Sequence, residues 1–596
     1  MDAVLQVSIQ NVIRRCQADY YDYIVVGSGF GGGVLTQTLC TAPVKPPARV
    51  LLIERGGFEF SSHCLNTPRP HWATTLTEGP SQDNDIVFRA VKSSVNTVSS
   101  SSYEYTGGPV HCIGGRSIVW GLYTPTMHPD EASAHFPASV CSYLSEKDGY
   151  NKAYRLLCND KKANLASPYP LTVFTIESVI QNVNKALDEG IGRQFNARPF
   201  EVCAMGAQFA SHEAEDVLYR PLAGAFSTVS WIMGRVHNHD EQLTVLANTQ
   251  VVTVNQDDHA TDAASGKKIV TSLTVRQTSS TTCGCCSCGE KEWTIPVGKK
   301  TRVVLSAGTI DTAVIALRSG IGSSLSHEPD QTEMNVGRGL MDHDIWGTRF
   351  EIATEGGDLG ELGAKPLKLQ SWVRFGNESN KSDWVLLNIA INAPLFFTGE
   401  STFARAVTYM DGNLDLLTEP QFEDKLRGGS NRNGEDVKRG KMTIQVVYEF
   451  CANLNNSNRV LDTPQLTPTL LIERLDDNSP KVPEMCKLAS CIGDILAKAI
   501  SKPYYIPADK HIPSVPPTKL ARAGFGAVAH EVGTMRMAKT PGEKGAVVDE
   551  NLGVIGWSNL YVCDLSVFPV SPAANPTLTL TALAQRLGHH LLEVRP

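Results

Sequence analysis

The residues whose types and spacing most clearly point to chemistry are a glycine-rich run and the acid that follows it. Residues 27–32 read GSGFGG, a G-x-G-x-x-G pattern, and Glu54 stands 22 residues after Gly32. Gly27 would make a tight turn, Gly29 would let the backbone approach a pyrophosphate, and Gly32 would let a helix pack on a strand. Glu54 could accept hydrogen bonds from both hydroxyls of a ribose. The pattern predicts a dinucleotide site, with Phe30 among its residues, and does not distinguish FAD from NAD.

Short apolar runs surround these residues and would have to position them. Tyr23–Val26 and Val50–Ile53 carry the aliphatic residues typical of buried parallel strands, and Val34–Cys40 reads as a helix between them. A helix that begins at the glycines would direct the positive end of its dipole at a phosphate. The same strand pattern returns at Arg302–Leu305, just before Gly308. The dinucleotide-binding unit is therefore predicted to be discontinuous along the chain.

A second glycine-rich segment follows the first. Gly107 and Gly108 form one glycine pair, and Gly114 and Gly115 form another close behind it. Glycine pairs at this spacing favour a backbone pressed against a flat or charged ligand, because glycine leaves room for a close approach. A cluster of surface turns is the alternative interpretation.

A third group consists of the cysteines Cys283, Cys285, Cys286 and Cys288. Their overlapping C-x-x-C spacings could hold zinc or copper(I) through thiolates. The group is very compact for one tetrahedral site, however, and it lacks a second, distant pair. We therefore interpret it as an exposed loop of reduced thiols and predict no bound metal. A metal or redox site and a vicinal disulfide are the alternatives.

Composition limits the class of protein. The 596 residues are enough for two or three domains, and the net charge of -8 argues against general nucleic-acid binding. No apolar run approaches the roughly 20 residues that a membrane helix needs. The first 21 residues lack a basic segment followed by an apolar one, and the cysteine count of 15 is odd. These features predict an intracellular, cytoplasmic protein with reduced thiols.

Motifs along the chain, taken together, resemble those of the glucose–methanol–choline (GMC) flavin oxidoreductases. The opening glycine-rich unit is similar to the start of that family, and Gly114–Gly121 is similar to its first signature. Ala307–Gly322 resembles the second signature, and Asn335–His343 resembles a further family segment. The strongest resemblance is C-terminal and lies in His530–Met537, Ala546–Asp549, Asn559–Asp564 and Ala574–Thr579.

The resemblance implies that the dinucleotide is FAD. Besides Gly27, Gly29, Phe30, Gly32 and Glu54, it assigns to the cofactor site Gly114, Gly115, Ser117, Val251, Ala307, Gly308, Asp564, Asn575, Pro576 and Thr577. Val119 stands where the pyranose 2-oxidase branch carries a histidine that binds FAD covalently, so we expect non-covalent FAD. Asp564 is expected beside the ribityl chain, with a plain turn cap as the alternative.

The resemblance also implies a catalytic pair. The C-terminal motif is closest to the pyranose 2-oxidase and cholesterol oxidase branches, in which an asparagine partners the catalytic histidine. His530 is then the general base and Asn575 the partner that hydrogen-bonds the substrate oxygen; neutral imidazole suits this task near pH 7. The alternative for His530 is an ordinary buried histidine. Asn575 also reads as an N-cap before Pro576, at the start of a helix over Thr577–Leu592. We assign His343 a structural or FAD-domain role, with direct chemistry as the alternative.

The expected fold class is α/β, with a discontinuous Rossmann-like FAD-binding domain and an α+β substrate domain built on an antiparallel sheet. The FAD-binding domain is expected to comprise residues 20–135, 236–345 and 541–596. The substrate domain is expected to comprise residues 136–235 and 346–540, with His530 at the junction. Its predicted elements are strands at Leu367–Phe375, Trp384–Asn392, Lys441–Ala452 and Thr469–Arg474 and a helix at Cys486–Ile500.

These features predict an FAD-dependent oxidoreductase that oxidises a small-molecule alcohol by hydride transfer to flavin N5. The electrons would pass to O2 or another acceptor, and the binding motifs do not separate an oxidase from a dehydrogenase. The substrate could be a sugar, a sterol-like alcohol or a specialised metabolite. The alternatives are a non-redox lyase or rearrangement enzyme on the same fold, a related photodecarboxylase, an NAD-dependent dehydrogenase, and a metal-binding or redox-sensing protein that uses the cysteine loop.

Overall fold

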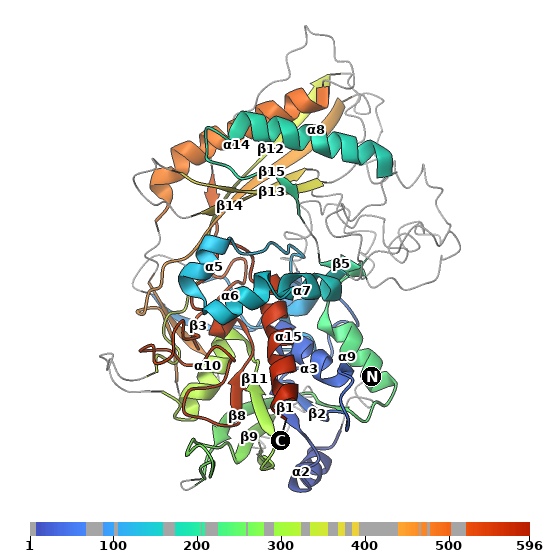
Figure 1. Cartoon of the computed structure of the whole chain (residues 1–596), viewed down its shortest axis with the longest axis vertical. Coiled ribbons are helices and arrows are strands. Elements are labelled where there is room, and N and C mark those ends of the chain that lie inside the picture. The colour runs from blue at the N-terminus through green and yellow to red at the C-terminus, as the bar shows by residue number, and fades with distance from the viewer. Residues whose placement is uncertain are drawn as a thin grey trace, which may run out of the picture.

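The structure is a computed structural model of the whole chain. It describes residues 7–66, 87–99, 105–158, 173–203, 206–208, 224–257, 260–278, 291–322, 334–355, 367–375, 384–391, 439–463, 467–473, 477–501 and 520–595. The cysteine loop at residues 283–288 lies outside these ranges. Figure 1 shows a lower part that contains both termini and an upper part built around a second sheet.

A five-stranded parallel sheet lies in the lower part. Its order is β19 (Leu560–Val562), β11 (Arg302–Leu305), β1 (Tyr23–Val26), β2 (Val50–Ile53) and β7 (Leu243–Leu246). All residues of β1 and β2 are buried, as in parallel sheets covered on both faces. The two strands pair in register, from Tyr23 opposite Val50 to Val26 opposite Ile53. Both therefore end at one edge of the sheet, where the glycine-rich run and Glu54 follow.

Helices lie against this sheet and begin where its strands end. α3 (Phe30–Thr41) follows β1, and α10 (Gly308–Arg318) follows β11. α15 (Thr577–Glu593) packs along α3, and Gly588 permits the contact because a Cβ there would lie 2.7 Å from Thr38 Cγ2. α9 (Thr228–His237) packs on the other end of α3 and precedes β7. The N-termini of α3 and α10 consequently meet at the same edge of the sheet.

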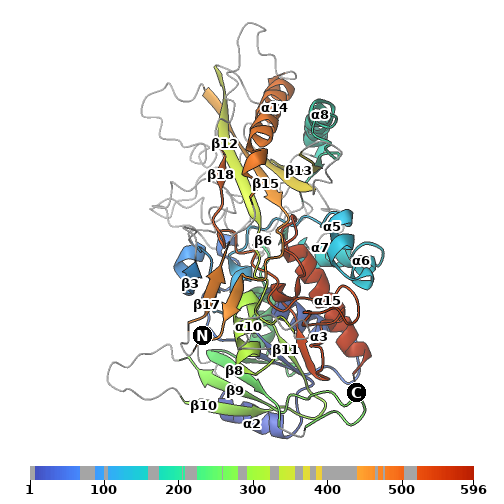
Figure 2. The same cartoon turned by 90° about the vertical axis from the view of Figure 1, so that its left-hand side faces the viewer.

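A three-stranded antiparallel sheet lies in the chain between β7 and β11. β8 (Thr249–Asn255), β9 (Ser272–Gln277) and β10 (Glu292–Pro296) pair in the order β10-β9-β8. It lies near α2 (Ile9–Gln17) at the bottom of Figure 2. The sequence predicts Ile269–Gln277 and Trp293–Val297 as the arms of a β-hairpin or meander, and the antiparallel pairing of β9 with β10 confirms this.

The upper part contains a six-stranded sheet whose strands all pair antiparallel. Its order is β18 (Ala521–Arg522), β12 (Asp344–Glu355), β15 (Arg439–Phe450), β14 (Val385–Ile391), β13 (Leu367–Val373) and β4 (Glu201–Val202). α14 (Val482–Ser501) and α8 (Val173–Ile191) cover one face, as Figure 2 shows. The strands predicted at β13, β14 and β15 and the helix at α14 are confirmed. β12 was not predicted.

Shorter elements connect these parts. They are α5 (Pro129–His135), α6 (Ala138–Ser145), α7 (Gly149–Cys158), β3 (Asn96–Ser99), β5 (Ala207–Gln208), β6 (Gly224–Ala225), β16 (Arg459–Leu461), β17 (Thr469–Ile472) and the 3-10 turns η1 (Cys64–Asn66), η2 (Gly115–Ile118), η5 (Ser479–Lys481) and η6 (Leu565–Val567). The fold is thus mixed α/β with several sheets, as the sequence indicated. Within the described ranges, no helix has both the length and the apolar character needed to cross a membrane.

Candidate active site

A first cavity opens where the glycine-rich run meets the edge of the parallel sheet. Gly27 has a φ of +98°, and a Cβ there would lie 2.2 Å from Ser306 O. A Cβ on Gly32 would lie 2.0 Å from Gly27 O, so close packing of α3 on the strand requires glycine. A Cβ on Gly29 would have no atom of the protein nearer than Gly114 O at 3.9 Å. The fold therefore requires Gly27 and Gly32, whereas Gly29 leaves space at the cavity.

Helix N-termini supply main-chain donors to this cavity. α3 starts after Gly29 and α10 after Ala307, and neither cap residue gives a side-chain hydrogen bond. Gly308, at the start of α10, has a φ of +88°, and a Cβ there would meet nothing within 4 Å. Uncapped N–H groups at helix N-termini attract anions. This donor set fits the pyrophosphate of a dinucleotide such as FAD.

Glu54 lies at the same edge and already has partners within the protein. Its Oε2 accepts hydrogen bonds from Ser28 N at 3.0 Å and Ser28 Oγ at 2.6 Å, and its Oε1 accepts one from Gly56 N at 3.0 Å. Burial raises the pKa of Glu54, and these hydrogen bonds oppose the rise. A carboxylate has about four acceptor positions, so Glu54 keeps capacity for a ribose hydroxyl.

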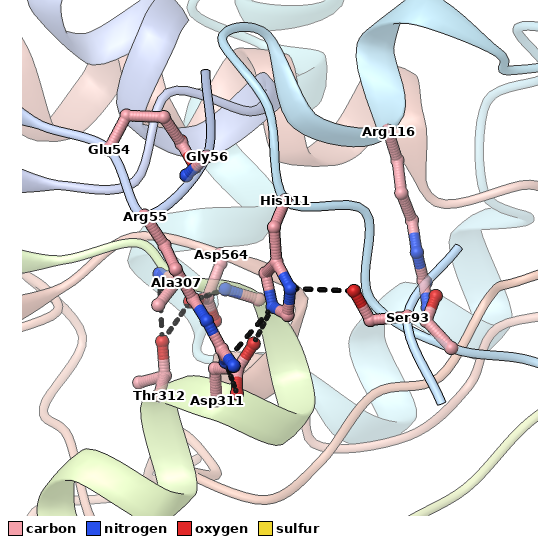
Figure 3. Close-up of polar contacts among 12 residues, drawn as sticks. Glu54, Arg55, Gly56, Ser93, His111, Arg116, Ala307, Asp311, Thr312 and Asp564 are labelled. Carbon is pink, nitrogen blue, oxygen red and sulfur yellow. Dashed lines mark hydrogen bonds and ion pairs between the residues drawn. The ribbon is translucent and has the colours of Figure 1, made fainter. Parts of the chain in front are cut away.

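A polar cluster that sequence reasoning missed lines the opposite side of the first cavity. His111 Nε2 lies 2.7 Å from Asp311 Oδ2, and His111 Nδ1 lies 2.7 Å from Ser93 Oγ (Figure 3). Arg55 Nη1 lies 3.4 Å from Asp311 Oδ1. Burial opposes ionisation of Asp311, but His111 and Arg55 hold the pKa of its carboxyl below the ordinary value. No motif marks His111; its position between two glycine pairs was the one available signal.

Asp564 follows the edge strand β19 and connects it to the start of α10. Its Oδ2 accepts hydrogen bonds from Gly308 N at 2.9 Å and Thr312 Oγ1 at 2.5 Å. Its Oδ1 accepts the N–H of Ser566 at 2.9 Å, which makes Asp564 the N-cap of η6. The cap that we weighed as the alternative is therefore present. Asp564 also lines the first cavity, where a ribityl hydroxyl could reach it.

A second cavity brings together the residues of the proposed catalytic pair. Asn575 Nδ2 lies 3.4 Å from His530 Nε2, although 45 residues separate the two in sequence. Asn575 was expected to cap α15 as well, and this prediction is wrong. The N-cap of α15 is Pro576, and no side chain caps the helix. Among the described residues, neither Asn575 Oδ1 nor His530 Nδ1 has a hydrogen-bond partner, so both remain available to a ligand.

The surroundings of His530 keep its imidazole neutral. Burial lowers the pKa of His530 to about 3, and the nearby ring of His343 lowers it further. The two rings are edge to face, with centroids 4.8 Å apart. The preceding residue, Ala529, has a φ of +58°, which is strained for a residue with a side chain. The imidazole is therefore neutral at physiological pH and has a ring nitrogen that can accept a proton, while burial makes its protonated form unfavourable.

A buried ion pair connects the first signature segment to the His530 segment. Arg116 donates to both carboxylate oxygens of Glu531, and it also donates to Ala529 O at 2.8 Å. Tyr105 donates a further hydrogen bond to Glu531. Burial opposes ionisation of Glu531, but Arg116 and Tyr105 hold its pKa below the ordinary value. Sequence reasoning missed both Arg116 and Glu531, although each lies inside a quoted motif.

Side chains of the six-stranded sheet complete the second cavity. Lys368 of β13, Asn388 of β14, and Gln445 and Glu449 of β15 line it together with His530 and Asn575. The two cavities share four lining residues, Phe30, Arg116, Leu565 and Leu580. A long cofactor could therefore reach from the glycine-rich run to the catalytic pair.

The structure sorts the predicted site residues into three sets. The first cavity is lined by Gly27, Gly29, Phe30, Glu54, Gly115, Val251, Ala307, Gly308 and Asp564. The second is lined by Phe30, His530, Asn575 and Thr577. Neither lining includes Gly32, Gly114, Ser117 or Pro576. Ser117 is buried, with its Oγ 3.0 Å from Thr228 Oγ1, so it supports the site through packing.

The chain is similar to several known proteins. The chain is 23% identical to versicolorin B synthase of Aspergillus parasiticus, covering 96% of this chain and 88% of that protein. It is 22% identical to the long-chain-alcohol oxidase FAO1 of Arabidopsis thaliana, and the alignment covers 96% of this chain and 67% of that protein. The crystal structure of pyridoxine 4-oxidase from Mesorbium loti shares the fold, with a TM-score of 0.55, 15% identity, and coverage of 96% of this chain and 99% of that chain.

The family assignment rests on the C-terminal part of the chain. A family model described as GMC oxidoreductase matches residues 460–584, which include His530, Asp564 and Asn575. This range holds the proposed catalytic pair and the start of α15. The resemblance found in the motifs is therefore confirmed for this part of the chain, which matches the model of the C-terminal GMC oxidoreductase domain.

Proposed function

We propose that this protein is an FAD-dependent enzyme that oxidises the CH–OH group of a small-molecule alcohol, with His530 as the general base. The single observation that carries the proposal is the His530–Asn575 pair. Its two nitrogens lie 3.4 Å apart in the second cavity, which shares lining residues with the first. The match of residues 460–584 to a GMC oxidoreductase model and the similarity to an alcohol oxidase support it.

The residues would divide the work as follows. The neutral imidazole of His530 would take the hydroxyl proton of the alcohol. The amide of Asn575 would hold the substrate oxygen, and it is free to do so because it does not cap α15. The N-terminus of α15, with Thr577 at the cavity, would present N–H groups and partial positive charge. A bound flavin would supply the hydride acceptor.

The cofactor would be FAD in a Rossmann-like domain built from residues 20–135, 236–345 and 541–596. Non-covalent attachment is proposed because Val119 offers no nucleophile. It lines the second cavity and stands at the position where the pyranose 2-oxidase branch has its covalently attached histidine. Residues 136–235 and 346–540 would form the substrate domain. Its sheet supplies Lys368, Asn388, Gln445 and Glu449, so the substrate would meet polar side chains as well as apolar ones.

A non-redox reaction on the same fold is the second candidate. One relative that aligns over 96% of the chain bears the name of a synthase rather than an oxidase. The same His530–Asn575 pair could remove a proton without a net change in the oxidation state of the substrate.

The visible spectrum of the purified protein, followed by an anaerobic titration with a panel of alcohols, tests the proposal. A flavin spectrum, release of the flavin on acid precipitation, and bleaching by an alcohol are expected. A colourless protein that cannot be reconstituted with FAD would contradict the proposal and leave an NAD-dependent enzyme open. A yellow protein that no alcohol bleaches would favour the non-redox candidate.

A further inference from the structure

The six-stranded sheet presents a buried carboxylate to the second cavity. Along β15, Gln445, Val447 and Glu449 line this cavity, while the residues between them pack into the core beneath α14. This division follows from the two-residue period of a strand. Glu449 is only 3% exposed. The chemistry proposed for His530 and Asn575 does not use this carboxylate.

The contacts of Glu449 hold it close to the proposed base. Its Oε1 accepts a hydrogen bond from Asn388 Nδ2 at 2.7 Å, and its Oε2 lies 3.3 Å from His343 Nδ1. One ring nitrogen of His343, one of His530 and one carboxylate oxygen of Glu449 all lie within 4.8 Å of one another. A separation of this size is within reach of a proton transfer through one water or through the intervening imidazole.

The protonation states of this cluster differ among its members. Burial raises the pKa of Glu449 to about 7, while His530, Lys368 and the Asn388 hydrogen bond oppose the rise. Burial lowers the pKa values of both His343 and His530 to about 3. Below pH 7 a proton in the cluster therefore resides on the carboxyl group, and above pH 7 the carboxylate can accept one. The other titratable groups around the cluster are Tyr123, Cys203 and Lys368 on the sheet side and Arg116 and Glu531 on the His530 side.

We propose that Glu449 is a positioning residue that receives, through His343 or a bridging water, the proton that His530 takes from the alcohol. This inference rests on the proposed alcohol oxidation. The alcohol O–H bond breaks and an N–H bond forms on His530. The carbon-bound hydride goes to the flavin, and the alcohol becomes a carbonyl compound. The proton then moves from His530 to the Glu449 carboxylate and later to solvent, so both groups return to their starting states.

The test is the pH dependence of flavin reduction in the flavin-loaded protein, mixed anaerobically with an alcohol that bleaches it. In the wild type, the reduction rate should rise through about pH 7 and then level off, because the Glu449 carboxylate must be ionised. In Glu449→Gln the rise in reduction rate near pH 7 should disappear. The flavin reduction rate of this variant at pH 9 should be about 10²-fold below that of the wild type, the lower end of general-base contributions. Glu449→Asp, which keeps a carboxyl group, should retain the rise.

Glu201→Gln is the matched control. Glu201 belongs to the same sheet and accepts a side-chain amide hydrogen bond from Gln370 at 2.5 Å, but it lines neither cavity. The Glu201→Gln variant should show the same flavin reduction rate and the same pH dependence as the wild type. A bleached flavin with an unchanged pH profile in Glu449→Gln would overturn the relay alone. A wild-type flavin that no alcohol bleaches would overturn the proposed function, and the relay with it.

Thermal unfolding gives a readout that needs no turnover. The folded-state pKa of Glu449 is raised from 4.5 to about 7, so the folded protein takes up a proton that the unfolded chain has lost in this pH window. Wild-type stability relative to Glu449→Gln should therefore fall as the pH rises from about 4.5 to about 7. A stability difference that does not change with pH would overturn the assignment of the proton to Glu449.

Discussion

The two cavities differ in whether backbone or side chains provide most of their polar groups. The first uses mainly backbone: glycines, helix N-termini and the ends of parallel strands, with Glu54, Asp564 and the His111–Asp311 pair as side chains around them. The second uses side chains that converge from distant segments, among them His530, Asn575, Lys368 and Glu449. A site made of backbone depends on local turns and can be broken by one added methyl group. A site made of side chains depends on the fold to assemble it.

The contrast predicts that a substitution in the first cavity lowers the affinity for FAD, whereas a substitution in the second cavity lowers the rate of flavin reduction by the alcohol. The two cavities meet at Phe30, Arg116, Leu565 and Leu580. Changes at this junction should affect both properties to a smaller extent.

The largest effect is expected from Gly29→Val. A Cβ at Gly29 meets no atom of the protein within 3.9 Å, so the chain should fold, but the side chain would occupy the space that a pyrophosphate needs. The purified variant should contain essentially no FAD by absorbance, with a thermal unfolding midpoint like that of wild-type apoprotein. Gly234→Val is the control, since that exposed glycine of α9 has open space around its Cβ position. Stoichiometric FAD in Gly29→Val would refute the placement of the cofactor.

The next effect is expected from His530→Ala, which should keep FAD and lose turnover. Removing a general base costs about 10²–10⁴-fold in rate. Single-turnover reduction of the flavin by an alcohol measures this loss directly. The control is His237→Ala, an exposed histidine in the last turn of α9, which should leave the rate unchanged. Wild-type rates in His530→Ala would remove this residue from the mechanism.

The same contrast explains how much could be predicted from the sequence. The bounds of β1 and β2 follow from local residue types, and the structure has them as predicted. The helix after β1 was predicted from Val34, but α3 already begins at Phe30, so the turn is shorter than expected. β12 was missed although Trp346, Phe350 and Ile352 alternate with Gly347, Arg349 and Glu351, which is a pattern typical of a strand with one buried face. Its extended state comes from pairing with β15 along its whole length, which is a contact between distant residues.

The catalytic pair could be named only through the family resemblance, because no local pattern links residues 45 positions apart. The N-cap prediction for Asn575 failed for a related reason. Cap propensity describes a side chain with no other partner, whereas the fold places this amide beside His530. Glu449 was missed because it lies in an ordinary strand, where only the two-residue alternation of β15 marks the face that it shares with Gln445.

At the junction of the cavities, Arg116→Lys should moderately lower the free energy of unfolding. Lysine keeps the charge but cannot form the two-pronged contact with Glu531, nor also reach Ala529 O. A loss of about 2 kcal/mol in the free energy of unfolding is expected, since hydrogen bonds to charged groups are worth about that much. Chemical denaturation measures it, and the flavin reduction rate should fall because Ala529 precedes His530.

The control for this change is Arg276→Lys. Arg276 pairs with Glu292 at the edge of the β8–β10 sheet, where the side chain of Glu292 is 48% exposed. Such surface pairs contribute about 0–1 kcal/mol. Equal losses in the two variants would show that the Arg116–Glu531 pair has no special role in holding the His530 segment.

The smallest effect is expected from His111→Asn, because the first cavity takes most of its donors from the backbone. His111 joins Ser93 to Asp311 and helps to keep that carboxyl ionised. Without it, the affinity of the apoprotein for FAD should fall about tenfold, equivalent to about 1.4 kcal/mol. Fluorescence titration measures the affinity, and His239→Asn is the control, because His239 is exposed with a φ of +53° that asparagine tolerates. An unchanged affinity would mean that the His111–Asp311 pair supports the fold, and that backbone alone holds the cofactor in the first cavity.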